Sequence, residues 1–228
     1  MQAKAKIIVG KETNMKQKNQ ILWYAALASL IAFVLWTVLL CTVDVQPIGP
    51  QGSYVGLATL NGAVHSFFEV NMLLYTVTDW FALVPLAVVC SFALLGVCQW
   101  VRRKRLRLVD RSVLVLGVFY LVVMAVFLLF EIFAINYRPV LIDGVLEASY
   151  PSSTTMLVAC VMPTALMQLR THVRSRLLLR CMRVLTAAFV AFMIAARLLS
   201  GVHWLTDIIG AGLISTGLVL LYRALTER

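Results

Sequence analysis

Six long apolar stretches, separated by short polar segments, dominate the pattern of this chain. At a rise of about 1.5 Å per residue, an apolar helix of about 20 residues crosses the hydrocarbon core of a bilayer. The pattern therefore predicts an all-α, polytopic membrane protein whose six transmembrane helices form a bundle. The predicted spans are residues 21–43, 77–99, 112–134, 154–169, 183–196 and 204–221.

The polar segments add two features to this picture. Residues 1–20 are polar and contain five lysines, which predicts a cytoplasmic N-terminal tail ahead of a membrane domain of residues 21–228. Residues 55–76 are moderately apolar but contain several polar side chains, which predicts an outer loop with a short helix in the membrane interface. We expect His65 of this segment to lie at the surface, at the level of the lipid headgroups.

Composition and charge agree with a membrane protein. Hydrophobic residues make up 61% of the chain and charged residues 13%, which is outside the usual range of soluble domains. Of the 20 lysines and arginines, 18 fall on one side of a six-helix arrangement. The positive-inside rule then places both termini in the cytoplasm, in a plasma membrane that we expect to be bacterial. Because the basic residues cluster between apolar stretches, they indicate topology and contact with anionic lipid, and not nucleic-acid binding.

Only Arg138 and Arg197 fall on the outer side of this arrangement. Arg197 precedes His203 by six residues, and Asp207 follows the histidine by four, which places the two side chains on one face of a helix. A carboxylate in that position orients an imidazole and stabilises its cation. The cluster is either a polar tie between two helices or a chemical site, and the spacing alone leaves both open.

A second polar stretch lies where the fourth span begins. Pro151 is followed by Ser152, Ser153 and Thr154 and then by a long apolar run, which is typical of a helix N-terminus. Free backbone N–H groups and the positive end of the helix dipole bind phosphate at such a terminus. Together with the outer arginines, this stretch predicts an anion site that faces outward.

These stretches resemble three motifs of the type 2 phosphatidic acid phosphatase and haloperoxidase superfamily, in the same order. The family motifs are a lysine followed after six residues by Arg-Pro, then Pro-Ser-Gly-His, then Ser-Arg followed by His and Asp at fixed spacings. The membrane members share the six-helix topology. The matching positions in this chain are Glu131, Arg138, Pro139, residues 151–154, Arg197, His203 and Asp207.

The resemblance implies a reaction and a role for each matched residue. His203 would attack phosphorus and form a phosphohistidine, and Asp207 would orient it. Arg138 and Arg197 would hold the phosphate oxygens, together with Ser152 and the adjacent backbone amides. The implied substrate is a lipid-linked phosphate or diphosphate in the membrane, with no metal and no organic cofactor. The particular lipid and the oligomeric state stay open.

Two departures from the family pattern change the expected chemistry. Glu131 replaces the first-motif lysine, and Thr154 replaces the second-motif histidine that protonates the leaving oxygen. A threonine hydroxyl is a poor general acid. Another acid therefore serves, with Glu131 favoured over Asp143 and Glu147, or the substrate is a diphosphate, such as a polyprenyl diphosphate, that needs little acid assistance. The third alternative is an impaired family member that binds lipid phosphates without turnover.

Overall fold

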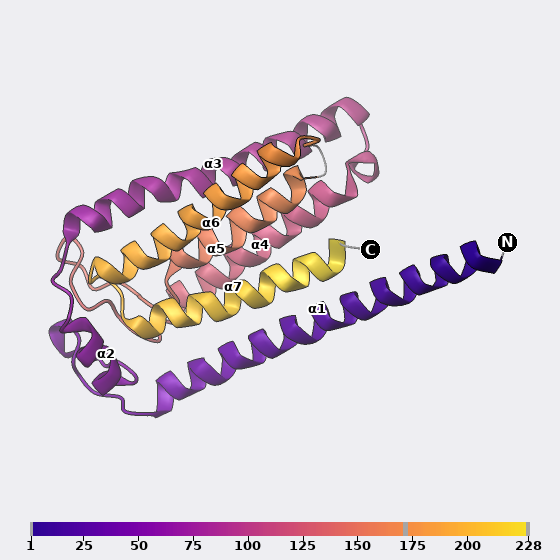
Figure 1. Ribbon diagram of the computed structural model, residues 1–228. Helices are drawn as coiled ribbons and strands as arrows, with labels where there is room; N and C mark the ends of the chain where they lie inside the picture. Colours follow the sequence, from indigo (N-terminus) through magenta and orange to yellow (C-terminus); the bar gives the residue numbers. More distant parts are fainter. Residues whose placement is uncertain (1, 171–172, 227–228) are drawn as a thin grey trace.

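The computed structural model describes residues 2–170 and 173–226, with side chains from Met15 onward (Figure 1). In this part of the chain the secondary structure is helical, with only isolated β-bridges between loop residues. The expectation of an all-α protein is confirmed for these residues. The α-helices are α1 (Gln2–Thr42), α2 (Ala58–His65), α3 (Met72–Arg103), α4 (Arg111–Ile132), α5 (Ser153–Leu169), α6 (Arg176–Leu199) and α7 (Leu205–Thr226).

Five of these helices are long and apolar enough to cross a membrane: α1 from Met15 onward, α3, α4, α6 and α7. The apolar helix α5 is shorter, at 17 residues. This arrangement is that of a multi-pass membrane protein. A count of six spans requires α5 as the sixth, and this number stays a prediction.

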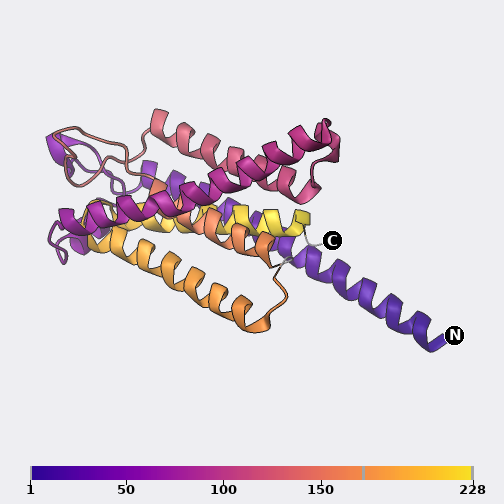
Figure 2. The ribbon, with the colours of Figure 1, turned by 90° about the horizontal axis from the view of Figure 1, so that it is seen from above.

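The long helices run alternately in opposite directions along a common axis (Figures 1 and 2). One end of the bundle carries α2 and the loops 43–57, 133–152 and 200–204, and α3, α5 and α7 all begin there. Both ends of the described chain lie toward the opposite end. Three segments that are far apart in the sequence therefore meet at one end of the bundle.

Two helices begin earlier than the apolar pattern predicted. Helix α3 begins at Met72 and not at residue 77, because the Asn71 side chain caps it by accepting the Leu74 N–H at 2.9 Å. Helix α6 begins at Arg176 and not at residue 183, because Ser175 caps it through the Leu178 N–H at 3.3 Å. The predicted starts were wrong because each helix already begins at its N-terminal capping residue and includes polar residues ahead of the apolar run.

The predicted tail and the first span form one continuous helix, α1, of 41 residues. Its N-terminal part extends well beyond the other helices (Figures 1 and 2). The division of the chain into a cytoplasmic tail of residues 1–20 and a membrane domain of residues 21–228 stays a prediction.

Helix α7 is the central helix of the bundle. In the most apolar 18-residue segment of α7, 50% of the residues are buried, compared with 6% in the corresponding segments of α3 and α6. The outer faces of α3 and α6 are apolar and exposed, as contact with lipid requires. Helix α1 packs along α7 and is fixed to it by two polar contacts. Ser29 donates to the Leu213 carbonyl at 2.8 Å, and the Trp36 indole donates to the Thr206 carbonyl at 3.2 Å.

The short helix α2 lies within residues 55–76, as expected, but it is tied to the bundle. Asn61 is fully buried and donates to the Gly56 carbonyl at 2.8 Å and to the Thr206 hydroxyl at 2.9 Å. Since Thr206 belongs to the first turn of α7, α2 holds the beginning of the central helix in place.

Tyr150 joins the loop before α5 to three helices. Its ring stacks on Phe33 at 6.0 Å and meets the edge of Phe130 at 5.7 Å, and its hydroxyl lies 2.8 Å from Thr37 Oγ1. The ring also lies directly against α7, where a Cβ at Gly210 would come within 2.4 Å of it. The absence of a side chain at Gly210 allows this close contact.

We predict that Gly210→Ala destabilises the protein by about 1–3 kcal/mol, because the added methyl group overpacks the site of the Tyr150 ring. Gly212→Ala is the matched control on the same helix, since a Cβ there meets nothing within 4 Å. Both substitutions raise helix propensity by the same amount, so the difference between the two melting temperatures in detergent measures the steric effect. Equal melting temperatures for the two variants would contradict the packing described here.

Candidate functional site

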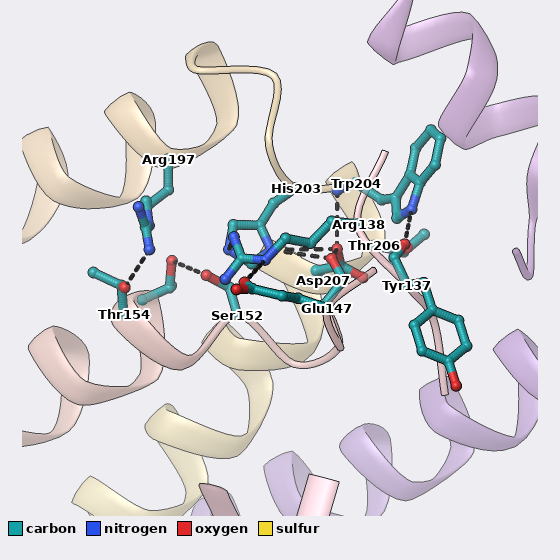
Figure 3. Close-up of polar contacts among 12 residues, drawn as sticks. Tyr137, Arg138, Glu147, Ser152, Thr154, Arg197, His203, Trp204, Thr206 and Asp207 are labelled. Atoms are coloured by element: carbon teal, nitrogen blue, oxygen red, sulfur yellow. Dashed lines mark hydrogen bonds and ion pairs between the residues drawn. The ribbon is translucent and has the colours of Figure 1, made fainter. Parts of the chain in front are cut away.

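Polar and charged side chains gather at the end of the bundle where α3, α5 and α7 begin (Figure 3). They come from the loops 133–152 and 200–204, from the first two turns of α3, from the first turns of α5 and α7, and from the last turn of α6. Arg138, Arg197, His203 and Asp207 are all buried there, each with no more than 7% of its surface exposed. The structure thus brings the three separated polar stretches together.

His203 is held through both ring nitrogens. Nε2 lies 3.3 Å from Arg138 Nη1, and Nδ1 lies 3.1 Å from Ser149 Oγ and 3.5 Å from Asp207 Oδ2. A guanidinium group only donates, so Nε2 must accept and carries the lone pair. The proton is then on Nδ1, which donates to Ser149, and the Ser149 hydroxyl donates to Asp207. The nitrogen with nucleophilic capacity is therefore Nε2.

Asp207 combines a structural contact with this orienting role. Its Oδ2 accepts the Trp204 N–H at 2.9 Å, which caps the first turn of α7. Its backbone carbonyl accepts the Ser152 N–H at 3.2 Å. One residue thereby fixes the loop that carries His203, the start of α7 and the loop before α5.

Arg197 is 2% exposed and lies among partners from two helices, α3 and α5. Nη2 donates to Thr154 Oγ1 at 2.6 Å, and Nη1 donates to Thr78 Oγ1 at 3.1 Å. Nη1 also forms an ion pair with Asp79 Oδ1 at 3.0 Å. The buried Nε has no hydrogen-bond partner among the described residues and remains available to an anion.

Arg138 is 7% exposed and is held in the loop 133–152. Its backbone N–H donates to the Glu147 carbonyl at 3.0 Å, and its Nε lies 3.0 Å from Glu147 Oε2. The Tyr75 ring lies near both arginines, with its centroid 5.7 Å from Arg138 Cζ and 4.7 Å from Arg197 Cζ. The electron-rich face of this ring stabilises two neighbouring cations that would otherwise repel each other.

The start of α5 forms the floor of the site. Ser152 is the N-cap, but its hydroxyl donates to Thr155 Oγ1 at 3.0 Å and accepts no hydrogen bond from a backbone N–H of the first turn. The amides of the first turn therefore lack a side-chain cap, as expected for an anion-binding terminus. Ser153 lines the cavity described next, and Thr154 faces Arg197 (Figure 3).

The three carboxylates proposed as the general acid, Glu131, Asp143 and Glu147, differ in their surroundings. Glu131, at the end of α4, is exposed and lines a cavity of about 40 Å³ together with Arg138, Glu147 and Ser149. Glu147 is the direct ion-pair partner of Arg138. Asp143 lies in a turn with a positive φ of 49°.

Four contributors to the site were missed from the sequence: Tyr75, Thr78, Asp79 and Ser149. Asp79 had a usable signal, because a charged residue inside an apolar span indicates a function. The other three had none, since hydroxyl and aromatic residues are ordinary near the end of a span.

The expected position of His65 was wrong. Its Nε2–H donates to the Gly201 carbonyl at 3.0 Å, and its ring lies 5.3 Å from the ring of Trp204. His65 therefore supports the loop 200–204 that carries His203, and it is partly buried there. Among the described residues, no three His, Cys, Asp or Glu side chains group together as metal ligands would.

Comparisons with protein-family models and with curated proteins found no match. Among solved structures, the chain is similar to the first transmembrane PAP2 type phosphatidylglycerolphosphate phosphatase from Bacillus subtilis, with a TM-score of 0.59 and 17% sequence identity. The similarity covers 90% of this chain and 96% of that chain. The chain therefore has the fold of a membrane PAP2-type phosphatase, the fold that its motifs led us to expect.

Burial, followed by the nearby Arg138 and Arg197, holds the pKa of His203 well below 6.5. The unfolded chain therefore takes up a proton here at a higher pH than the folded protein. Neutral His203 contributes stability that is fully present above about pH 6.5 and is lost as the pH falls toward the lower folded pKa.

We predict that the melting temperature of the protein falls between pH 7.5 and pH 5.5, and that His203→Gln falls less over the same range. The glutamine cannot titrate, so it removes this contribution and keeps a polar side chain in place. Melting curves in detergent at several pH values measure the difference. Parallel curves for both proteins would mean that His203 is not held neutral by its surroundings.

Proposed function

We propose that the protein is a membrane lipid phosphatase or diphosphatase that works through a phosphohistidine on His203. One observation carries this proposal: the lone pair of His203 Nε2 faces the guanidinium group of the buried Arg138 while Nδ1 is held by Ser149 and Asp207. A nucleophile needs an unprotonated nitrogen and a fixed orientation, and both are present.

The remaining site residues are those that a phosphoryl group requires. Arg138 and Arg197 neutralise the oxygens, with the unpartnered Nε of Arg197 available for a direct bond. The backbone amides at Ser153 and Thr154 supply further donors at the helix N-terminus. These groups stabilise the charge that develops on the oxygens as the phosphorus is attacked.

Thr154 directs the choice of substrate. Its hydroxyl accepts a hydrogen bond from Arg197, so it supports the phosphate clamp, and it is a poor acid for the leaving oxygen. A lipid diphosphate expels a phosphate, which leaves far more easily than an alkoxide. This favours a diphosphate substrate, and a polyprenyl diphosphate is its most specific form.

For its location, we propose six spans in a bacterial plasma membrane, both termini in the cytoplasm and the site facing outward. The charge distribution of the loops supports this orientation. The position of both chain ends at the end of the bundle away from the site is consistent with it (Figure 1).

The alternative is a protein that binds lipid phosphates without turnover. The replacement of the usual second-motif histidine by Thr154 favours this reading, and the complete set around His203 opposes it. Glu131 remains the acid proposed from the sequence, and it lines the cavity with Arg138 and Ser149.

We predict that purified protein releases phosphate from at least one lipid phosphate or diphosphate, and that His203→Ala lowers the rate by at least about a thousandfold, because the attacking atom is removed. A malachite-green screen across lipid phosphates and diphosphates measures it, with Gly212→Ala as the control. Equal release by His203→Ala would refute the mechanism. Lipid phosphates that raise the melting temperature without any release would favour the binder.

We predict that Ser149→Ala lowers kcat by roughly ten- to a hundredfold and changes KM little, because it removes the hydroxyl between His203 and Asp207 and leaves both arginines in place. Ser91→Ala is the matched control, since the Ser91 hydroxyl bonds only the Ala87 carbonyl of its own helix. Steady-state kinetics on the best substrate distinguish the two. An unchanged kcat for Ser149→Ala would show that the hydrogen bonds from His203 through Ser149 to Asp207 do not contribute to catalysis.

A further inference from the structure

Asp79 is the only acidic residue of α3, a helix whose apolar window has a mean hydropathy of 2.5. It lies in the second turn, so it is placed inside the end of a membrane-spanning helix. A carboxylate in such a position is costly and is expected to have a functional partner. The mechanism above gives it no role.

The partner of Asp79 is the phosphate clamp. Its Oδ1 lies 3.0 Å from Arg197 Nη1, and Arg197 Nη2 lies 2.6 Å from Thr154 Oγ1. Asp79 and Thr154 therefore contact neighbouring nitrogens of one guanidinium group. Asp79 is thus close to the position at which the superfamily motif has its proton-donating histidine.

This side of the site lies away from the nucleophile. Figure 3 shows Arg197 with Thr154 on one side, and His203 with Arg138 and Asp207 on the other. A phosphoryl group held between the two arginines would meet Nε2 of His203 on one face. In an in-line displacement the leaving oxygen departs from the opposite face, toward Thr154 and Asp79.

Asp79 is also accessible to a substrate. Its side chain is 45% exposed, whereas that of Arg197 is 2% exposed. A phosphate bound to Arg197 would compete with Asp79 for the N–H groups of the guanidinium group. A carboxylate beside an added anion takes up a proton, because neighbouring negative charges disfavour the ionised form.

We infer that Asp79 donates the proton to the leaving oxygen, in a role that rests on the proposed phosphohistidine mechanism. The bond from His203 Nε2 to phosphorus forms, the bond from phosphorus to the leaving oxygen breaks, and the proton of the Asp79 carboxyl group moves to that oxygen. In the second half, a water oxygen bonds to phosphorus, the bond from phosphorus to His203 Nε2 breaks, and Asp79 accepts a proton from the water. Free phosphate leaves, and both residues return to their starting forms.

The other carboxylates are placed less favourably for this step. Glu147 is paired with Arg138, which itself contacts His203, so it lies on the nucleophile's side. Glu131 lines the cavity with Arg138 and Ser149, which also belong to that side. Asp79 alone among these acids is in direct contact with the arginine that holds Thr154.

The test uses full-length protein in detergent with two substrates of different leaving groups. A lipid monophosphate expels an alkoxide and needs an acid, whereas p-nitrophenyl phosphate expels a stable phenolate and needs almost none. We expect Asp79→Asn to lower kcat/KM by on the order of 10²–10⁴-fold for the lipid monophosphate and by less than about tenfold for the aryl phosphate. Because both values come from one preparation, their ratio is independent of the folded fraction.

Three further variants complete the design. Asp110→Asn is the matched control: it breaks an Asp–Arg ion pair of 2.8 Å with Arg103 at the far end of the bundle, and we expect the wild-type ratio. Asp79→Glu keeps the acid and should recover most of the selective loss. Glu131→Gln tests whether Glu131 is the proton donor instead.

An equal loss for both substrates in Asp79→Asn would overturn the proton-donor role and leave Asp79 as a partner of Arg197 only. A selective loss in Glu131→Gln, with none in Asp79→Asn, would assign the proton to Glu131. If wild-type protein releases phosphate from no substrate, the proposed function falls, and the role of Asp79 falls with it. Release by wild-type protein with a failed Asp79 test leaves the phosphatase assignment standing.

Discussion

Two buried arginines at one end of an apolar bundle are the constraint on which the rest of the structure depends. Removing a guanidinium group from water is costly, and the cost is recovered only when its charge and its N–H groups find partners. Arg197 finds them on α3 and α5, and Arg138 finds them in the loop 133–152 and on His203. The ring of Tyr75 serves both. The end of the bundle where α3, α5 and α7 begin is therefore organised by contacts with these two cations.

This arrangement has a consequence for ligand binding. In the structure as it stands, each arginine is paired with a partly exposed acid, Asp79 for Arg197 and Glu147 for Arg138. The resting site is thus close to neutral. A phosphate that binds both arginines must displace or protonate at least one of these acids, since otherwise two sets of negative charge would share the same cations. An anion that binds both arginines therefore competes with at least one of these two ion pairs.

The sequence predicted the features that depend on local pattern. Apolar runs located every long helix, but the helical spacing of His203 and Asp207 held only in part, because Asp207 lies in the first turn of α7 and His203 lies in the loop before it. The starts of α3 and α6 were missed because a single capping side chain, Asn71 or Ser175, decides them. The apolar run that begins after the cap carries no information about that cap.

The contributions of Ser149 and Asp79 could not be derived in the same way. Ser149 reaches His203 across 54 positions of sequence, and Asp79 reaches Arg197 only because α3 and α6 lie side by side with a particular rotation. Helix rotation is set by side-chain packing over the whole bundle, which no periodicity in a single helix reveals. A lone charge in an apolar span indicates a partner, but the identity of that partner is a tertiary fact.

The substitution at Thr154 and the presence of Asp79 are best understood together. Arg197 can only donate, so each neighbour must accept, and the Thr154 hydroxyl does so at 2.6 Å. A protonated histidine at the same position would bring a second donor and a second positive charge next to that guanidinium group. With threonine there, the position is neutral and accepting, and the transferable proton has to come from another group. The acid that already touches Arg197 meets this requirement without any change in the fold.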